Sequence, residues 1–191
     1  MDSLTYLYLK LQAVTLLVFG RKRAALERFE AMRVLAPQNL YVMASRAHLL
    51  GELGDKQGAV DALQEITRRH PDGSAGWFNL GFMLDDMGRH LEAEPAFRRA
   101  LEAEPKMDRA WYGLALVLIR QRRFDEAIVA LRKNTELQPM SPFGWYQLAR
   151  VHVDRHEPEE AAKIIRHLHG FEPKVAAQLE RETGLRVAQG S

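Results

Sequence analysis

Five prolines recur along the chain at a fixed interval of 34 residues, at Pro37, Pro71, Pro105, Pro139 and Pro173. Because proline cannot continue a helix, each one is expected to end a helix at the same place in a recurring unit. The interval divides the chain into five blocks, which span residues 6–39, 40–73, 74–107, 108–141 and 142–175. A period of this length is typical of repeat proteins, in which each block is one supersecondary unit.

Residue size also recurs within the blocks and predicts two packed helices in each. The eighth and twentieth positions hold alanine or glycine, such as Ala47 and Ala59 in the second block. Helices approach closely only where the side chains between them are small. Large residues at the fourth and twenty-fourth positions, such as Met43 and Leu63, are expected to fill the space between neighbouring pairs. Glycine recurs at the fifteenth position, as Gly20, Gly54 and Gly88. It permits the left-handed residue of a tight turn between helices.

The composition favours an all-α protein. Good helix formers dominate, and no stretch alternates apolar and polar residues over the length of a strand. Hydrophobic residues make up 47% of the chain and charged residues 27%, which is ordinary for a soluble folded protein. The net charge of +2 is too weak to indicate a nucleic-acid partner. The chain has no cysteine, which excludes disulfides, thiolate metal sites and cysteine nucleophiles.

Two stretches of the chain resemble the tetratricopeptide repeat (TPR). They are WFNLGFMLDDMGRHLEAEPAFRRALEAEP (77–105) and WYGLALVLIRQRRFDEAIVALRKNTELQP (111–139), and the resemblance extends over about nine-tenths of the chain. It implies a right-handed superhelical solenoid of five helix–turn–helix pairs, forming one domain over residues 1–191, with the first helix of each pair lining a concave groove. Beyond the repeats, the terminal segment 176–191 is assigned to a capping helix and tail: a short helix is expected over residues 174–182, ended by Gly184, and a frayed tail from residue 186. Pro95 departs from the pattern and is expected to kink or delay the second helix of its block.

The sequence carries no enzyme signature. It has no glycine-rich phosphate loop, no Gly-x-Ser-x-Gly elbow and no HExxH motif. His152 and His156 have a spacing that suits a metal ion, but the sequence offers them no third ligand. We therefore interpret His152 as a core residue and His156 as a turn residue. We expect no catalytic residue, no cofactor and no bound metal.

In the TPR family the second, fifth, ninth, twelfth and thirteenth positions of each block face the concave groove, and the sixth position lies near it. Chaperone-binding TPR domains clamp a C-terminal carboxylate there, but only Asn79 and Arg109 match the residues of that clamp. The asparagine ladder of the glycosyltransferase type is also absent, because only Asn79 fits it. Neither of these two groove types is therefore expected.

A row of aromatic residues with interleaved polar side chains occupies the groove positions instead. The row consists of Tyr41, His48, Phe78, Asn79, Phe82, Arg109, Tyr112, Phe143, Tyr146 and Arg150. We expect it to bind an extended or helical segment of a protein partner, with the arginines holding carbonyl or acidic groups. The alternative is that some of these aromatic residues pack between adjacent first helices. The predicted function is that of a non-enzymatic adaptor or scaffold. The alternative function is a chaperone-like or regulatory subunit of a secretion, assembly or membrane-associated complex.

Basic residues cluster in the predicted turns, over residues 21–23 and 120–123. Both clusters fall on one edge of the expected solenoid. They are interpreted as a solvated edge, because no base-stacking motif accompanies them. No nucleic-acid partner is expected.

The segment from residue 4 to residue 19 is apolar almost all round but keeps the repeat register. It contains Lys10 and Gln12 and falls short of the about 20 apolar residues that a membrane span needs. A signal peptide is not expected either. As the first helix of a first repeat, the segment should need a cover on its outer face. The predicted docking residues are Leu4, Leu7, Tyr8 and Leu11. The expected cover is a second copy in a homodimer, a partner protein or a membrane surface, and the expected location is cytoplasmic, at most peripheral to a membrane.

Overall fold

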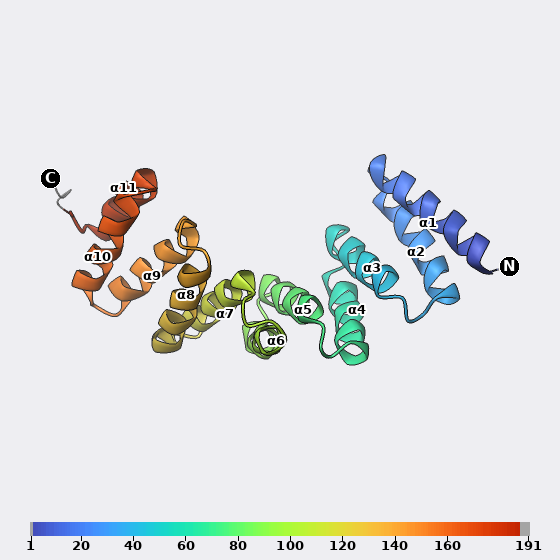
Figure 1. The fold of residues 1–191 in the computed structure, drawn as a ribbon, viewed down its shortest axis with the longest axis horizontal. Helices are drawn as coiled ribbons and strands as arrows, with labels where there is room; N and C mark the ends of the chain where they lie inside the picture. The colour runs from blue at the N-terminus through green and yellow to red at the C-terminus, as the bar shows by residue number, and fades with distance from the viewer. Residues whose placement is uncertain (1, 188–191) are drawn as a thin grey trace. The chain divides into compact units, whose positions relative to one another are not determined.

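The computed structural model describes residues 2–187, and the regular structure within that range is entirely helical (Figure 1). The chain divides into two compact units between Ala103 and Glu104. The predicted all-α fold of paired helices is confirmed. That both units belong to one continuous solenoid stays a prediction, and each unit is described by itself.

The first unit contains three helix pairs. They are α1 (Asp2–Val18) with α2 (Lys22–Leu35), α3 (Leu40–Glu52) with α4 (Lys56–Arg69), and α5 (Ser74–Asp86) with α6 (His90–Ala103). The described part of the second unit contains two pairs and one further helix. They are α7 (Asp108–Arg120) with α8 (Phe124–Leu137), α9 (Pro142–Asp154) with α10 (Pro158–His169), and α11 (Pro173–Thr183). The four boundaries between consecutive predicted blocks each fall between two pairs.

The small residues predicted at the helix crossings are buried. Ala47 and Ala59 lie in the contact between α3 and α4 and are almost inaccessible to solvent. In the third block the crossing residue is Gly81, where an added Cβ would lie 3.0 Å from Cδ1 of Phe97. The Phe97 ring is fully buried and takes the space that a methyl group would need. Burial of a side chain of this size contributes about 1.5–3 kcal/mol relative to its exposure to water.

Each hairpin turn contains one residue with a left-handed backbone. Gly20, Gly54 and Gly88 have φ angles of 69°, 87° and 75°, as their recurrence predicts. Arg122 and His156 hold the same position in the fourth and fifth blocks, and both have a φ of 60°. A residue with a Cβ is disfavoured in this conformation. The packing of the two helices therefore imposes the turn, even where the local sequence opposes it.

Three tryptophans link their blocks to the end of the preceding block. The indole Nε1 of Trp77 donates a hydrogen bond to the carbonyl of Pro71 at 2.7 Å. The equivalent bonds run from Trp111 to Pro105 and from Trp145 to Pro139, at 2.9 Å and 2.8 Å. The recurring proline thus ends a helix and also presents an acceptor to the next block.

Pro95 does not delay its helix, contrary to expectation. α6 begins at His90, the seventeenth position of its block, where the second helices of the other blocks also begin. The helix then continues through Pro95 to Ala103. Proline lacks the amide that would bond to Leu91, so the helix loses one hydrogen bond. Burial of Ala93 and Phe97 on either side holds the helix despite this loss.

α11 covers the last described helix pair, as the predicted capping helix should. It packs against α10 and α9 and buries Ala176 and Leu179. It starts one residue earlier than expected, at Pro173, because proline is well suited to the first turn of a helix. Val187 does not belong to a frayed tail: it is buried, and its amide donates to Oε1 of Glu180 at 3.0 Å. The remaining residues of the predicted tail, 188–191, lie outside the described range.

Candidate partner-binding cavity

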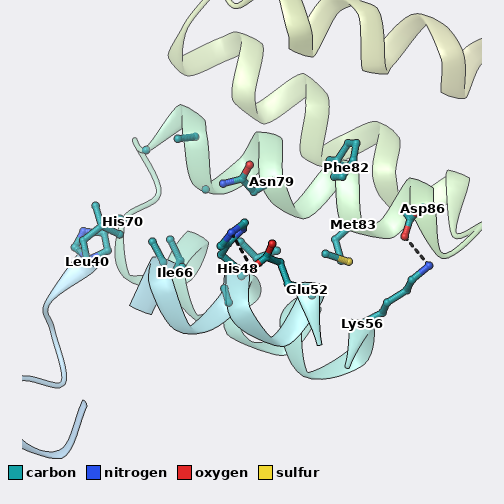
Figure 2. A pocket seen from close by; sticks show the side chains of 17 residues that line it. Leu40, His48, Glu52, Lys56, Ile66, His70, Asn79, Phe82, Met83 and Asp86 are labelled. Carbon is teal, nitrogen blue, oxygen red and sulfur yellow. Dashed lines mark ion pairs between the residues drawn. The ribbon is translucent and has the colours of Figure 1, made fainter. Parts of the chain in front are cut away.

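The first unit contains a cavity of about 510 Å³ between α3, α4 and α5 (Figure 2). α3 and α5 are the first helices of their blocks, the helices expected to line the groove. Leu63 and Ile66 reach the cavity from α4, and both are buried. Ligand sites in proteins commonly have volumes of roughly 300–1,000 Å³. The cavity is therefore large enough to take a bulky side chain.

Small residues on the two facing helices create this space. Ala44 and Gly51 line the cavity from α3, and Ala75 and Gly76 line it from α5. At Gly51 an added Cβ would lie 2.8 Å from Cε of Met83. The Met83 side chain thus uses the room that glycine leaves. Because methionine has flexible torsions and a polarisable sulfur, its end can adjust to an entering group.

The charged residues at the cavity are paired with one another or with neighbours. Lys56 and Asp86 form an ion pair at 2.6 Å, drawn in Figure 2. Glu52 accepts a hydrogen bond from Lys22 at 2.9 Å and lies 3.4 Å from Nε2 of His48. The hydrogen bond from Lys22 lowers the pKa of Glu52. The cavity mouth therefore carries no large excess of one charge.

His70 lies at one end of the cavity, beside Leu40 (Figure 2). Its Nε2 atom is buried and has no hydrogen-bond partner among the residues that the structure describes. Buried polar atoms are usually hydrogen-bonded, because leaving one unpaired is costly. A bound group with a polar atom at this end could satisfy the ring.

The structure brings together three of the groove residues predicted in this unit. His48, Asn79 and Phe82 line the cavity, with His48 on α3 facing Asn79 and Phe82 on α5 (Figure 2). The Phe82 ring is largely exposed and stacks at 6.4 Å on the ring of Phe78. Phe78 does not line the cavity. Its ring packs against the buried Phe97 of α6 at 6.0 Å, so the contact is made within its own helix pair and not between adjacent first helices.

Tyr41 is also absent from the residues that line the cavity. Its ring makes an edge contact with the buried Phe29 at 5.8 Å. The ammonium group of Lys10 lies 5.0 Å from the centroid of the same ring. Tyr41 therefore joins the first helix pair to the second, although part of its surface remains exposed.

The sequence was compared with models of known protein families. The tetratricopeptide-repeat model matches residues 45–84 and 84–133, a region that runs from within α3 to within α8. This chain contains tandem TPR repeats. No curated protein sequence matches it significantly.

Solved structures with the same fold share little sequence with this TPR protein. MamA (41-end) from Desulfovibrio magneticus RS-1 is 21% identical with a TM-score of 0.79, over 93% of this chain and 96% of that one. A TPR protein from Parabacteroides merdae ATCC 43184 is 18% identical with a TM-score of 0.83, over 94% and 74%. YrrB, described as a TPR protein with an unusual peptide-binding site, is 17% identical with a TM-score of 0.76, over 88% of each chain. These likenesses concern the fold.

In the second unit of the TPR protein, two predicted groove residues bind the capping helix. The Tyr146 hydroxyl donates to Oε2 of Glu182 on α11 at 2.5 Å. Arg150 donates to the Tyr146 hydroxyl at 3.2 Å and to Glu182 at 3.3 Å. The hydrogen bond from Tyr146 lowers the pKa of Glu182, and the bond to Tyr146 raises the pKa of Arg150. These groups are therefore engaged within the unit.

The other groove residues of the second unit differ in exposure. Phe143 and Arg109 are exposed, whereas Tyr112 is half-buried on α7. Phe143 lies at the start of α9, where 68% of its surface is accessible to solvent. Binding of a partner by this set stays a prediction.

Some of the basic turn residues of the TPR repeats form ion pairs with neighbouring acids. Lys22 pairs with Glu52 across two repeats, and Arg123 makes two hydrogen bonds to Glu126. In the fifth repeat Arg155 pairs with Asp125 of the fourth repeat. The interpretation as a solvated, charge-balanced edge fits these contacts.

His152 is placed as the sequence predicts. Its ring is buried, and Nδ1 lies 2.7 Å from Oε2 of Glu157. His156 is exposed in the left-handed turn. Within residues 2–187, no helix is both long and apolar enough to cross a membrane.

Sequence reasoning missed most of the cavity. The missed lining residues include Leu40, Gly51, Ile66, His70, Gly76 and Met83. One usable signal was present: Gly51 and Gly76 are glycines inside helices, away from the turn positions where glycine recurs. Glycine inside a helix costs about 1 kcal/mol relative to alanine, so it indicates a packing or binding reason.

Proposed function

We propose that this TPR protein is a non-enzymatic adaptor whose cavity between α3 and α5 holds an apolar side chain of a protein partner. TPR folds serve as scaffolds for protein–protein interaction. The observation that carries the proposal is the 510 Å³ cavity on the first helices of the second and third repeats. YrrB, which shares the fold, is described as having a peptide-binding site.

The lining supports an apolar anchor. Ala44, Ala75 and Gly76 line the cavity and carry no polar side-chain atoms. Leu63 and Ile66 form its buried apolar wall. A leucine- or phenylalanine-sized side chain that filled this space would gain about 1.5–3 kcal/mol from burial. Burial of this anchor and a few contacts at the rim are offset in part by the entropy lost when the partner segment becomes ordered. The net binding free energy corresponds to dissociation constants on the order of micromolar.

The polar groups support recognition of the main chain beside that anchor. Asn79 is exposed on α5, and its amide can donate to one peptide group and accept from another. The unpaired Nε2 of His70 could take one further hydrogen bond. Because the nearby charges are already paired, an internal segment of the partner fits better than a free terminal carboxylate.

A cavity-filling variant tests this proposal. Ala75 is exposed and lines the cavity, so Ala75→Trp should fill it without disturbing the buried core. The matched control is Val129→Trp, which adds the same side chain at an exposed position of α8. Both variants should keep the helical circular dichroism spectrum and melting temperature of the wild type.

The wild type and the two variants would be immobilised and used to capture proteins from a lysate, followed by mass spectrometry. We expect at least one protein that binds the wild type and Val129→Trp but is lost with Ala75→Trp. A synthetic segment of that protein should bind at least about tenfold more weakly after Ala75→Trp, or after its apolar anchor is changed to alanine. An identical set of captured proteins on all three baits would refute the proposal.

A further inference from the structure

One side of α1 is exposed and apolar along its whole length. Leu4, Leu7, Leu11, Val14 and Val18 are exposed by 78%, 62%, 65%, 42% and 78%. We call these five residues the α1 seam. Three of them belong to the docking residues predicted from the sequence, and the fourth, Tyr8, is exposed beside the seam. The opposite side of α1 is already used, because Leu9, Ala13 and Leu16 belong to or pack against the core of the first two helix pairs.

The spacing of the seam is that of a helix-pairing surface. Its members are separated by intervals of 3, 4, 3 and 4 residues. Alternation of 3 and 4 keeps side chains on one stripe that faces a second helix, as in a coiled coil. Apolar residues exposed at random along α1 would not follow this alternation.

We infer that the α1 seam pairs antiparallel with the α1 seam of a second copy of this chain, forming a symmetric dimer. The seam is centred on Leu11, which lies seven residues from both Leu4 and Val18. A two-fold axis through Leu11 sets Leu11 against its own copy and Leu4 of one copy against Val18 of the other, and it places Leu7 within one residue of the position opposite Val14. At both ends of the seam a leucine then meets a smaller valine, which lets the two surfaces interlock.

The charges agree with a second copy as the occupant. Lys10 is the single charged residue between positions 3 and 20. Its ammonium group lies 5.0 Å from the centroid of the Tyr41 ring of its own chain. The five seam residues are all uncharged, so the surface that would meet a second copy is wholly apolar. The antiparallel arrangement also sets the two helix dipoles in opposite directions, which is favourable.

A membrane surface fits the same face less well. Helices that lie in a membrane interface carry lysine and arginine along their polar face. α1 has no such face, because the side opposite the seam is packed into the protein. Lys22, from the basic residues that follow α1, is paired with Glu52.

Cysteine scanning tests the pairing and its direction, since the chain has no cysteine of its own. Leu11→Cys alone should form a disulfide-linked dimer under mild oxidation, because the axis brings the two positions together. Leu4→Cys and Val18→Cys should each stay monomeric alone but cross-link when mixed. Val34→Cys, at an exposed position of α2, is the control and should not cross-link. Self-cross-linking of Leu4→Cys and Val18→Cys would overturn the antiparallel register.

Light scattering of the wild type tests association without any modification. The measurement uses about 100 µM protein, because the weakest specific interfaces have dissociation constants in the micromolar range. At this concentration the measured mass should be twice 21.8 kDa. Leu11→Asp should halve that mass. The variant should keep the helical spectrum and the melting temperature of the wild type, because the Leu11 side chain is exposed in the folded chain. A monomeric wild type would overturn the inference. So would a monomer that binds vesicles of anionic and neutral phospholipid through Leu11, which would identify a membrane as the occupant.

Discussion

Two hairpin turns in the second unit hold a non-glycine residue in a left-handed conformation, and glycine there should stabilise the protein. Arg122 and His156 both have a φ of 60°, at the position where Gly20, Gly54 and Gly88 stand in the first unit. Both side chains are exposed, so their removal takes little packing away. The perturbations are Arg122→Gly and His156→Gly.

The expected gain is the difference between two opposing effects. A residue with a Cβ pays roughly 1–2 kcal/mol to adopt the left-handed region. Glycine removes that cost but loses about 0.5–1 kcal/mol more backbone entropy on folding. The net stabilisation should be about 0.5–1 kcal/mol for each variant. For a unit of this size it corresponds to a rise in melting temperature of about 2–8 °C.

Urea unfolding followed by circular dichroism measures this free energy directly. The variants should raise the unfolding midpoint without changing the slope. Gly54→Ala is the matched reverse test. An added Cβ at Gly54 has no atom within 4 Å, so any loss of stability there reports the backbone conformation alone.

The reasoning fails if both glycine variants are neutral or destabilising while Gly54→Ala costs nothing. That result would mean that left-handed backbone carries no penalty in these turns. A gain for the glycine variants with a neutral Gly54→Ala would instead point to a side-chain effect of Arg122 and His156.

Two further predictions concern the second unit. Gly144→Ala should destabilise the protein by about 1–3 kcal/mol in urea unfolding, because the new Cβ would lie 2.2 Å from Oδ1 of the buried Asn134. The double variant Asn134→Ala/Gly144→Ala should recover most of the loss due to the clash, and failure to do so would place the strain elsewhere. The pKa of Glu182 is lowered in the folded protein, mainly by the hydrogen bond from Tyr146. The bonds of Glu182 to Tyr146 and Arg150 therefore stabilise α11 at pH values above the ordinary carboxyl pKa of 4.5. This stabilisation is lost as the pH falls through the lower pKa that Glu182 has in the folded state. Tyr146→Phe should reduce the protection of α11 amides from hydrogen exchange at pH 6 and make that protection less sensitive to acid; unchanged protection would show that the contact contributes nothing.

The capping helix shows that residues at groove positions can be occupied by contacts within the same chain. Tyr146 and Arg150 stand at positions that line the groove in the TPR family, and their polar atoms meet Glu182, 36 residues further along from Tyr146. A partner that used these two residues would have to compete with α11. The cavity between α3 and α5 has no such internal occupant among the residues described, which is why the proposed function rests on it.

The sequence by itself determined the repeat register and the helix pairs. Proline every 34 residues, alanine at the crossings and glycine in three turns all act through neighbours within one block. Such local constraints repeat, so they remain readable as a period. The same logic identified His152 as a core residue, since its position on the helix decides its burial.

Only the tertiary structure decided the binding surface. The cavity is bounded by Gly51, Ile66 and Gly76, which come from three different helices, and its volume depends on how closely those helices approach. Tyr41, Phe78 and Phe82 all stand at groove positions of the repeat, yet the rings of Tyr41 and Phe78 contact the buried Phe29 and Phe97 and do not line the cavity. A period in the sequence tells which face of a helix a residue occupies. Whether that residue meets solvent, a neighbouring ring or a cavity depends on the size of side chains far away in the chain, and those sizes do not repeat.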